Sequence, residues 1–453
     1  MKKSIGMAAL WAAIAIAIAI LALPSLAAPS SGSVPGPIIV VNTWPFVNAT
    51  AKAWSVLTGT GQGNKDAVTA VVEGVSICEN LQCDHTVGFG GSPDETGGVT
   101  LDALVMDGKP YFLAFFFLVL HQLYVAPGPH THTLINHVLQ RSGDTLDAGA
   151  AVALHSTRHA ARAARLVMET TNHTMLAGKD ADAFAASMGL PQSSLRTAWS
   201  ESAWEDWKRA DCQPNYRRNV SPDPRVSCGP YRPRGDTIRG SRSAATSPLG
   251  TYGRDSEFNP LPSLPLALSD CRIFLDHDTI AMVARDATGS MAAATSTNGA
   301  THKVPGRLAD SGVVGSGAYV DTEVGGCGAT GDGDTMMRFV PCYQVLSLSL
   351  SLSLSLSLTT NRLDSRYLPP QPPAPQVVES MRRGMGPKEA AEEALSRIRS
   401  RHPTFQGALL ALSKAGEVGA ATNCMDFRYS VASGEHDGDV RVVEVPASVP
   451  CPQ

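Results

Sequence analysis

The sequence predicts a layered α/β fold with antiparallel sheets. Short β-branched or alternating runs, bounded by Gly and Pro, are interspersed with segments of helical spacing. They lack the regular strand-helix-strand repeat that parallel sheets require. At 453 residues the chain is long enough for one large domain or two, with a substantial buried core.

The first elements follow one another closely. Residues 37–44 (PIIVVNTW) are short, β-branched and bounded by Pro and Gly, which predicts a buried strand. Residues 65–80 have helical spacing. Residues 100–108 (TLDALVMDG) alternate like a strand and end in Asp-Gly, a favoured hairpin turn, and residues 145–154 predict the returning strand.

Residues 109–144 separate those two strands and are interpreted as an insertion at a hairpin tip. Extra chain at such a tip adds little closure entropy. The apolar run inside it is too short to span a bilayer comfortably. Its histidines have no partnering acid or cysteine, so we predict no metal site.

The rest of the chain combines regular elements with two stretches of biased composition. Residues 157–171 predict an amphipathic helix. Residues 232–270, which are rich in Pro, Ser, Gly and Arg, predict a mobile linker. Residues 279–299 read as strand, turn and strand. A monotonous Leu-Ser repeat marks residues 345–376 as an insertion that resembles translated repeat DNA, and residues 386–402 return to helix.

The N-terminus predicts export. Lys2 and Lys3 precede an apolar run and then small residues up to Ala27, as in a secretory signal peptide covering residues 1–27; an uncleaved anchor is the alternative. The formal net charge of −4 with dispersed basic residues gives no electrostatic footprint for nucleic acid. The sequons at Asn48 and Asn172 fit the exported route.

Nine cysteines agree with an oxidising compartment. Short spacings and a C-terminal location suggest three disulfide pairs, namely Cys78 with Cys83, Cys212 with Cys228, and Cys424 with Cys451. The unassigned cysteines are Cys271, Cys327 and Cys342. Because the count is odd, at least one thiol is expected to be free or bonded between molecules.

The chemistry centres on the stretch FLDHDTIAMV, in which Thr279 follows His277 and Asp278. These three cannot form a catalytic relay, because adjacent residues of an extended segment point to opposite faces. If the chain is cut before Thr279, however, that residue gains an α-amine beside its own hydroxyl. An α-amine has a reference pKa of about 7.7 to 8, which suits a general base near neutrality.

Several motifs occur in order between residue 40 and about residue 427: VVNTWPF, CENLQCDHTVGFGGSPDETGGVTLDALVMDG, CQPNYRRNV, HDTIAMV, TSTNG, PGRLADS, GAYVD and ATGDGD. Together they resemble the glycosylasparaginase (aspartylglucosaminidase) family of N-terminal nucleophile hydrolases. The resemblance implies a four-layer αββα sandwich, with two stacked antiparallel sheets between helices. It also implies a precursor that cuts itself into an α-subunit (28–278) and a β-subunit (279–453), which assemble as (αβ)2.

The resemblance also implies roles for individual residues. His277 and Asp278 assist the cut, and Thr279 then attacks the side-chain amide carbon of a glycosylated asparagine. A preorganised oxyanion hole and a cation-anion pair for the free α-groups are expected around it. The matching positions are Thr297 near the nucleophile, Thr330 and Gly331 in the oxyanion hole, Arg307 and Asp310 at the α-carboxylate and α-amino groups, and Trp44 and Thr86 in the substrate pocket.

The expected reaction is hydrolysis of the N4-(β-N-acetylglucosaminyl)-L-asparagine linkage, releasing L-aspartate and the amino sugar without metal or organic cofactor. The expected setting is a lysosome or vacuole, or outside the cell, without stable membrane insertion. One alternative is an L-asparaginase or isoaspartyl peptidase of the same superfamily. Another is an unprocessed, inactive secreted homologue in which the insertions block processing. Asp276, which stands where the family usually has glycine, also bears on the strain expected at the cut.

Overall fold

The computed structural model describes residues 36–60, 65–109, 146–234, 279–343 and 377–447, together with 449 and 451. Its largest element is a mixed sheet of eight strands, which are antiparallel except for the β3–β4 pair. In spatial order they are β14 (Arg441–Val445), β13 (Phe427–Ser433), β1 (Ile39–Thr43), β7 (Ile280–Arg285), β8 (Met291–Thr297), β2 (Leu101–Asp107), β3 (Ala148–Leu154) and β4 (Met175–Ala177).

A second, antiparallel sheet of four strands contacts the first one through β9 and β10. Its order is β12 (Val418–Asn423), β11 (Gly407–Ser413), β10 (Gly325–Gly331) and β9 (Ala318–Asp321). β5 (Val220–Ser221) pairs separately with β6 (Arg232–Pro233), which lies at the start of the expected linker.

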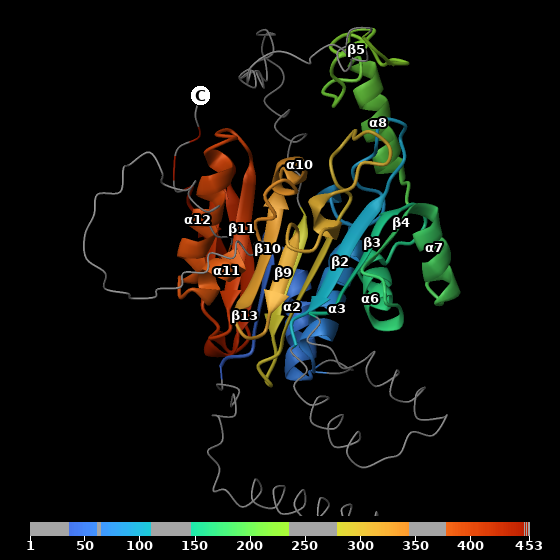
Figure 1. The fold of residues 1–453 in the computed structure, drawn as a ribbon. Helices are drawn as coiled ribbons and strands as arrows, with labels where there is room; N and C mark the ends of the chain where they lie inside the picture. Colours follow the sequence, from blue (N-terminus) through green and yellow to red (C-terminus); the bar gives the residue numbers. More distant parts are fainter. Residues whose placement is uncertain are drawn as a thin grey trace, which may run out of the picture.

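Helices contact both sheets (Figure 1). Those against the eight-stranded sheet are α2 (Val47–Thr58), α3 (Ala67–Leu81), α6 (Ala160–Thr170) and α7 (Gly178–Ser187). Those against the four-stranded sheet are α11 (Val377–Arg382) and α12 (Pro387–Arg399). The remaining two described helices are α8 (Ala198–Arg209), at the top of Figure 1, and the short α10 (Gly333–Met336).

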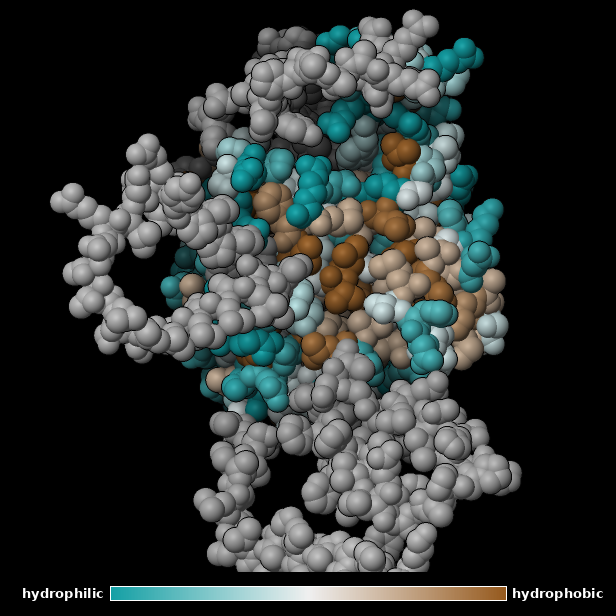
Figure 2. All heavy atoms as spheres, in the orientation of Figure 1, coloured by the Kyte–Doolittle hydropathy of each residue, from teal (hydrophilic) through white to brown (hydrophobic). Residues whose placement is uncertain are grey.

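Two hydrophobic clusters account for the core. One joins the facing sides of the two sheets and continues under α11 and α12, and the other lies between the eight-stranded sheet and helices α2, α3 and α6. On the face shown in Figure 2, hydrophobic residues gather across the middle and hydrophilic residues lie toward both ends. The result is a mixed α/β protein, as the sequence predicts.

The predicted elements in the described ranges are confirmed within a few residues. The strand expected at residues 37–44 is β1, and the helices expected at 65–80, 157–171 and 386–402 are α3, α6 and α12. β2 pairs antiparallel with β3, with Met106 opposite Ala148, so the two strands around the first insertion form a hairpin. β7 and β8 form the second predicted hairpin.

The backbone also continues across the second insertion. Val377 N donates to the Pro341 carbonyl at 3.2 Å, and Val378 N donates to the Cys342 carbonyl at 3.4 Å. Residues that lie more than thirty positions apart in the sequence are therefore bonded as successive residues of a helix would be.

Close contact between the sheets depends on glycine in β10. A Cβ added at Gly328 would lie 2.7 Å from Ala281 Cβ in β7, and one at Gly326 would lie 2.6 Å from Val283 Cγ1. Real Cβ atoms do not approach this closely, so larger residues would push the sheets apart.

Four disulfides are present. The three expected pairs form, Cys78–Cys83, Cys212–Cys228 and Cys424–Cys451. The fourth, Cys327–Cys342, joins β10 to the segment after α10 and pairs two cysteines that sequence spacing alone left unassigned.

Several expectations lie outside the described residues: the signal peptide at 1–27, the insertions from 110 and 345, Cys271, and the linker from 235 onward. Across the ranges that are described, no helix is both long enough and apolar enough to cross a membrane.

Replacing Cys327 and Cys342 together by Ala should lower the free energy of unfolding by about 3 kcal/mol, as expected for a bond closing a loop of roughly 15 residues. Urea denaturation of both proteins measures the difference. Non-reducing peptide mapping provides the control, and recovery of both cysteines as free thiols in the unsubstituted protein would contradict the assignment.

Candidate active site

Three threonines from two sheets meet at one edge of the sheet contact. Thr279 directly precedes β7, and Thr297 is the last residue of β8. Because Ile280 lies opposite Ser296 in that hairpin, Thr279 and Thr297 come to the same end of the pair. Thr330 lies near the end of β10, which contacts both strands.

Thr279 is buried, with 2% of its surface exposed. Its backbone nitrogen donates to Thr330 Oγ1 at 3.2 Å, and its carbonyl accepts a hydrogen bond of 2.8 Å from Thr43 Oγ1. The Thr43 hydroxyl also accepts from Ala281 N at 2.9 Å. The start of β7 is therefore fixed on both sides of the Thr279 α-carbon.

The Thr330 hydroxyl oxygen receives a second donor, the indole Nε1 of Trp44, at 3.0 Å. Trp44 stands edge-on to Phe427, with ring centroids 5.5 Å apart. Gly331 follows with φ +120°, and a Cβ there would lie 2.6 Å from both the Gln406 carbonyl oxygen and Gly407 Cα. Only glycine fits this close backbone approach.

Thr297 begins a tight turn. Its hydroxyl accepts from Gly299 N at 2.9 Å, and the backbone nitrogen of Asn298 donates to the Thr86 carbonyl at 2.7 Å. Thr297 Oγ1 itself lies 3.5 Å from the same Thr86 carbonyl. Thr86 thus reaches the predicted site through its backbone.

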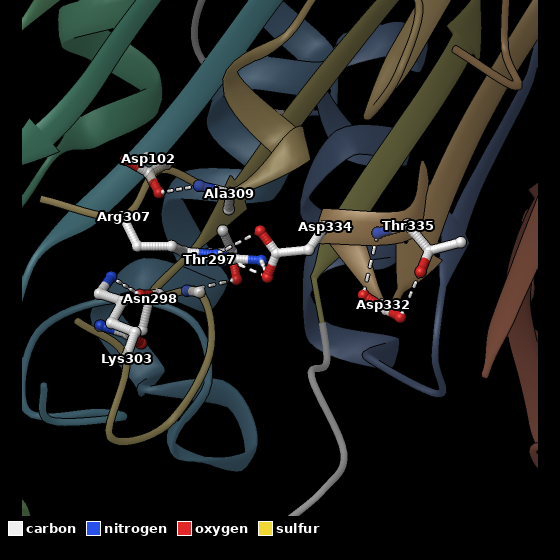
Figure 3. Close-up of polar contacts among 10 residues, drawn as sticks. Asp102, Thr297, Asn298, Lys303, Arg307, Ala309, Asp332, Asp334 and Thr335 are labelled. Carbon is white, nitrogen blue, oxygen red and sulfur yellow. Dashed lines mark hydrogen bonds and ion pairs between the residues drawn. The ribbon is translucent and has the colours of Figure 1, made fainter. Parts of the chain in front are cut away.

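Arg307 and Asp310 both lie beside Gly333. A Cβ added at Gly333 would lie 2.3 Å from Asp310 Oδ1 and 3.2 Å from Arg307 Nη2. The guanidinium of Arg307 pairs with Asp334, with 3.1 Å between Nη2 and Oδ2, and Figure 3 shows the two side chains extended toward each other near Thr297. Asp334 was missed as a functional candidate, although it ends the motif ATGDGD.

Asp310 is an unusual carboxyl. It is 2% exposed, and its Oδ2 atom has no hydrogen-bond partner in the described structure. Burial raises its pKa to about 7, and the nearby Arg307 guanidinium opposes that rise. A cationic group placed beside Asp310 would supply the missing partner and favour the ionised form.

Two further buried charges adjoin the site and were not predicted. Lys303 donates to the Asn298 carbonyl, and Asp102 accepts from the backbone nitrogen of Ala309 at 2.8 Å (Figure 3). Composition gives no signal for Lys303, since lysine is normally exposed. Asp102 stands in the quoted motif TLDALVMDG, but its alternation alone indicates a strand and nothing more.

The remaining predicted positions fall into two groups. His277 and Asp278 lie outside the described residues. Asn48 and Asn172 are exposed, so a glycan could be accommodated at either. Among the residues described, no group of three or more His, Cys, Asp or Glu side chains could hold a metal ion.

Asp310 gives a pH-dependent stability difference. Because its folded pKa of about 7 exceeds the ordinary value of 3.8, the stabilising contribution is complete below about pH 4 and is lost as pH rises through 7. Asp310→Asn removes the titration. The free energy of unfolding of the variant, relative to that of the unsubstituted protein, should therefore rise between pH 4 and 7, by up to about 1.4 kcal/mol per pH unit. Denaturant curves at four pH values test this, and parallel curves would show an ordinary carboxyl.

Comparisons with known proteins identify the family of this chain. Residues 19–113 and 138–363 match the family model described as Asparaginase. The chain is 41% identical over 410 residues to "Probable isoaspartyl peptidase/L-asparaginase 3" of Arabidopsis thaliana, covering 90% of each chain. A Drosophila melanogaster relative named for N(4)-(β-N-acetylglucosaminyl)-L-asparaginase activity is 39% identical, over 90% of this chain and 82% of its own.

The N(4)-(β-N-acetylglucosaminyl)-L-asparaginase of Mus musculus is 37% identical over 410 residues, which cover 90% of this chain and 91% of the mouse protein. The family match extends through the segments that carry the three threonines and Arg307. The chain therefore belongs to the asparaginase family of hydrolases, in the N-terminal nucleophile hydrolase superfamily.

Proposed function

We propose that this protein is a glycosylasparaginase, which hydrolyses the N4-(β-N-acetylglucosaminyl)-L-asparagine linkage with Thr279 as nucleophile. The observation that carries the proposal is the position of the Thr279 backbone nitrogen, 3.2 Å from Thr330 Oγ1 at the edge where the two sheets meet. A cut before Thr279 would turn that nitrogen into an α-amine already held beside a hydroxyl from the second sheet.

The α-amine then serves as the base. It takes the proton of the Thr279 hydroxyl while the oxygen attacks the side-chain amide carbon of the substrate. The protonated amine returns that proton to the departing glycosylamine nitrogen, which leaves a β-aspartyl ester on Thr279. Water, activated by the same amine, hydrolyses the ester and releases aspartate.

Thr330 and Gly331 form the proposed oxyanion hole. Donors help most when they are fixed before the reaction, since they then need no reorganisation as negative charge develops. The Trp44 indole holds the Thr330 hydroxyl, and the close approach of Gln406 holds Gly331. In this proposal Trp44 and Thr86 also line the substrate pocket, and Thr297 hydrogen-bonds near the nucleophile.

The aspartyl end of the substrate is a zwitterion, and the proposed site offers one fixed cation and one acid. Arg307 suits the α-carboxylate because its planar fork can bind two oxygens. The Arg307–Asp334 pair supports this role, because the guanidinium already binds a carboxylate from another segment of the chain. Asp310 suits the α-ammonium group, whose positive charge would draw the raised pKa of the carboxyl back down.

The same proposal includes maturation and location. His277 and Asp278 assist the cut that yields chains 28–278 and 279–453, which assemble as (αβ)2 in a four-layer αββα sandwich. The contacts from helices to sheet, sheet to sheet and sheet to helices support that layer order. Disulfides and exposed sequons support the secretory route, with the lysosome, a vacuole or the exterior as destination.

A second candidate is an L-asparaginase or isoaspartyl peptidase, the activity named for the Arabidopsis relative. Both reactions share the aspartyl end and differ in the leaving group, which is a glycosylamine, ammonia or an amino acid. Arg307 and Asp310 would serve either substrate, so kinetics must separate them.

N-terminal sequencing of the purified protein should find a fragment beginning at Thr279. The processed protein should hydrolyse N4-(β-N-acetylglucosaminyl)-L-asparagine with a kcat/KM at least about a hundredfold higher than for β-aspartyl dipeptides or free asparagine. This ratio corresponds to a difference in transition-state stabilisation of roughly 2.7 kcal/mol. Thr279→Ala should be uncut and inactive. Thr60→Ala, at an exposed position, is the matched control and should behave like the unsubstituted protein.

The outcomes separate the candidates. Faster hydrolysis of dipeptides or asparagine would favour the second candidate, and a single uncut chain without activity would favour an inactive secreted homologue. Activity that survives in Thr279→Ala would exclude the threonine as nucleophile.

A further inference from the structure

Lys303 is a buried cation with an unusual partner. Only 1% of it is exposed, and within the described ranges its ammonium group makes no ion pair. Instead it donates to the backbone carbonyl of Asn298. Burial lowers the pKa of Lys303 to about 8, against the opposing effect of Asp102. A charge held away from water without a close counterion is costly, so its retention needs an explanation.

The carbonyl that Lys303 holds belongs to the turn after Thr297. In that turn Gly299 N donates to Thr297 Oγ1 at 2.9 Å, and Gly299 has φ +73°. A Cβ added at Gly299 would lie 2.8 Å from Arg307 Nη1 and 3.2 Å from Lys303 Nζ. The turn therefore packs directly on two cations, and Lys303 fixes the peptide between Asn298 and Gly299.

Asp102 fixes the backbone of the segment that carries Arg307 and Asp310. It is fully buried and accepts from Ala153 N at 2.7 Å through Oδ1 and from Ala309 N at 2.8 Å through Oδ2. Ala309 immediately precedes Asp310. Since Asp102 also lies opposite Thr297 in the β2–β8 pair, it joins both halves of the site to one strand.

We propose that Lys303 and Asp102 are paired positioning residues for this reaction. Lys303 holds the turn that orients the Thr297 hydroxyl toward Thr279, and Asp102 holds the segment that presents Arg307 and Asp310 to the substrate. The inference rests on the proposed function, because it assigns each anchor to one part of that site.

Because Lys303 and Asp102 hold different parts of the site, we expect their loss to cause different kinetic defects. Loss of the Lys303 hydrogen bond disturbs the chemical step, since small displacements of a reacting group cost large factors in rate. Loss of the Asp102 acceptor disturbs binding of the α-carboxylate and α-ammonium groups. A role in folding alone would lower the amount of folded protein and leave kcat and KM per active site unchanged.

The variants are Lys303→Met, which keeps the length without a donor, Lys303→Gln, which keeps a donor without charge, and Asp102→Asn. Lys388→Met is the matched control, because the Lys388 side chain is 71% exposed. Rates are divided by the fraction of chains that begin at Thr279. Calorimetric titration with L-aspartate measures binding without turnover.

Lys303→Met should lower kcat about tenfold or more while KM changes less than about threefold, and Lys303→Gln should recover part of that loss but keep kcat at least about threefold below that of the unsubstituted protein. Asp102→Asn should raise KM about fivefold or more and weaken aspartate binding by a similar factor, with kcat within about threefold. Lys388→Met should match the unsubstituted protein.

Unchanged kcat and KM per processed chain in Lys303→Gln and Asp102→Asn would overturn the inference, and so would the same defect in both. If Lys303→Met fails to fold, the Gln variant still decides. A protein that is inactive before any substitution would instead refute the proposed function, which is a distinguishable result.

Discussion

The close approach of β10 to β7 is the constraint on which the rest of the structure depends. Gly326 and Gly328 add no side chain where β10 faces β7, and Ala281 and Val283 of β7 fill that space. The Thr330 hydroxyl can accept a hydrogen bond from the Thr279 backbone nitrogen only because the two strands lie this close together. A pair of larger residues in β10 would separate Thr279, the proposed nucleophile, from the proposed oxyanion hole.

Much of the fold could be predicted from local patterns. The β2–β3 pairing followed from two strand-like runs, despite the residues between them, because alternation and the Asp-Gly turn are local signals. The Cys327–Cys342 bond could not be predicted, since it depends on how β10 and the chain after α10 meet in three dimensions. Arg307 and Asp310 were identifiable from a motif, but the pairing of Arg307 with Asp334 and the buried anchors Lys303 and Asp102 arise from tertiary packing.

Burial acts in opposite directions on the two kinds of charge beside the site. It raises the pKa of the Asp310 carboxyl and lowers the pKa of the Lys303 ammonium, so each group is brought closer to neutrality than its ordinary value implies. A zwitterionic ligand would reverse part of this at Asp310 by bringing its own positive charge. In the proposed function this match favours substrates with a free α-amino group, because a ligand without that charge would give the buried carboxyl no cationic partner.

The hydrogen bonds that run from Val377 and Val378 back to Pro341 and Cys342 have a consequence for how this gene product can change length. These two bonds hold Pro341 and Cys342 close to Val377 and Val378, so chain added between the bonded residues has only to close a loop. Doubling such a loop adds only about 0.6 kcal/mol of closure free energy. The position between Cys342 and Val377 is therefore a site where added sequence costs the fold little. A reporter domain could be inserted there by design for the same reason.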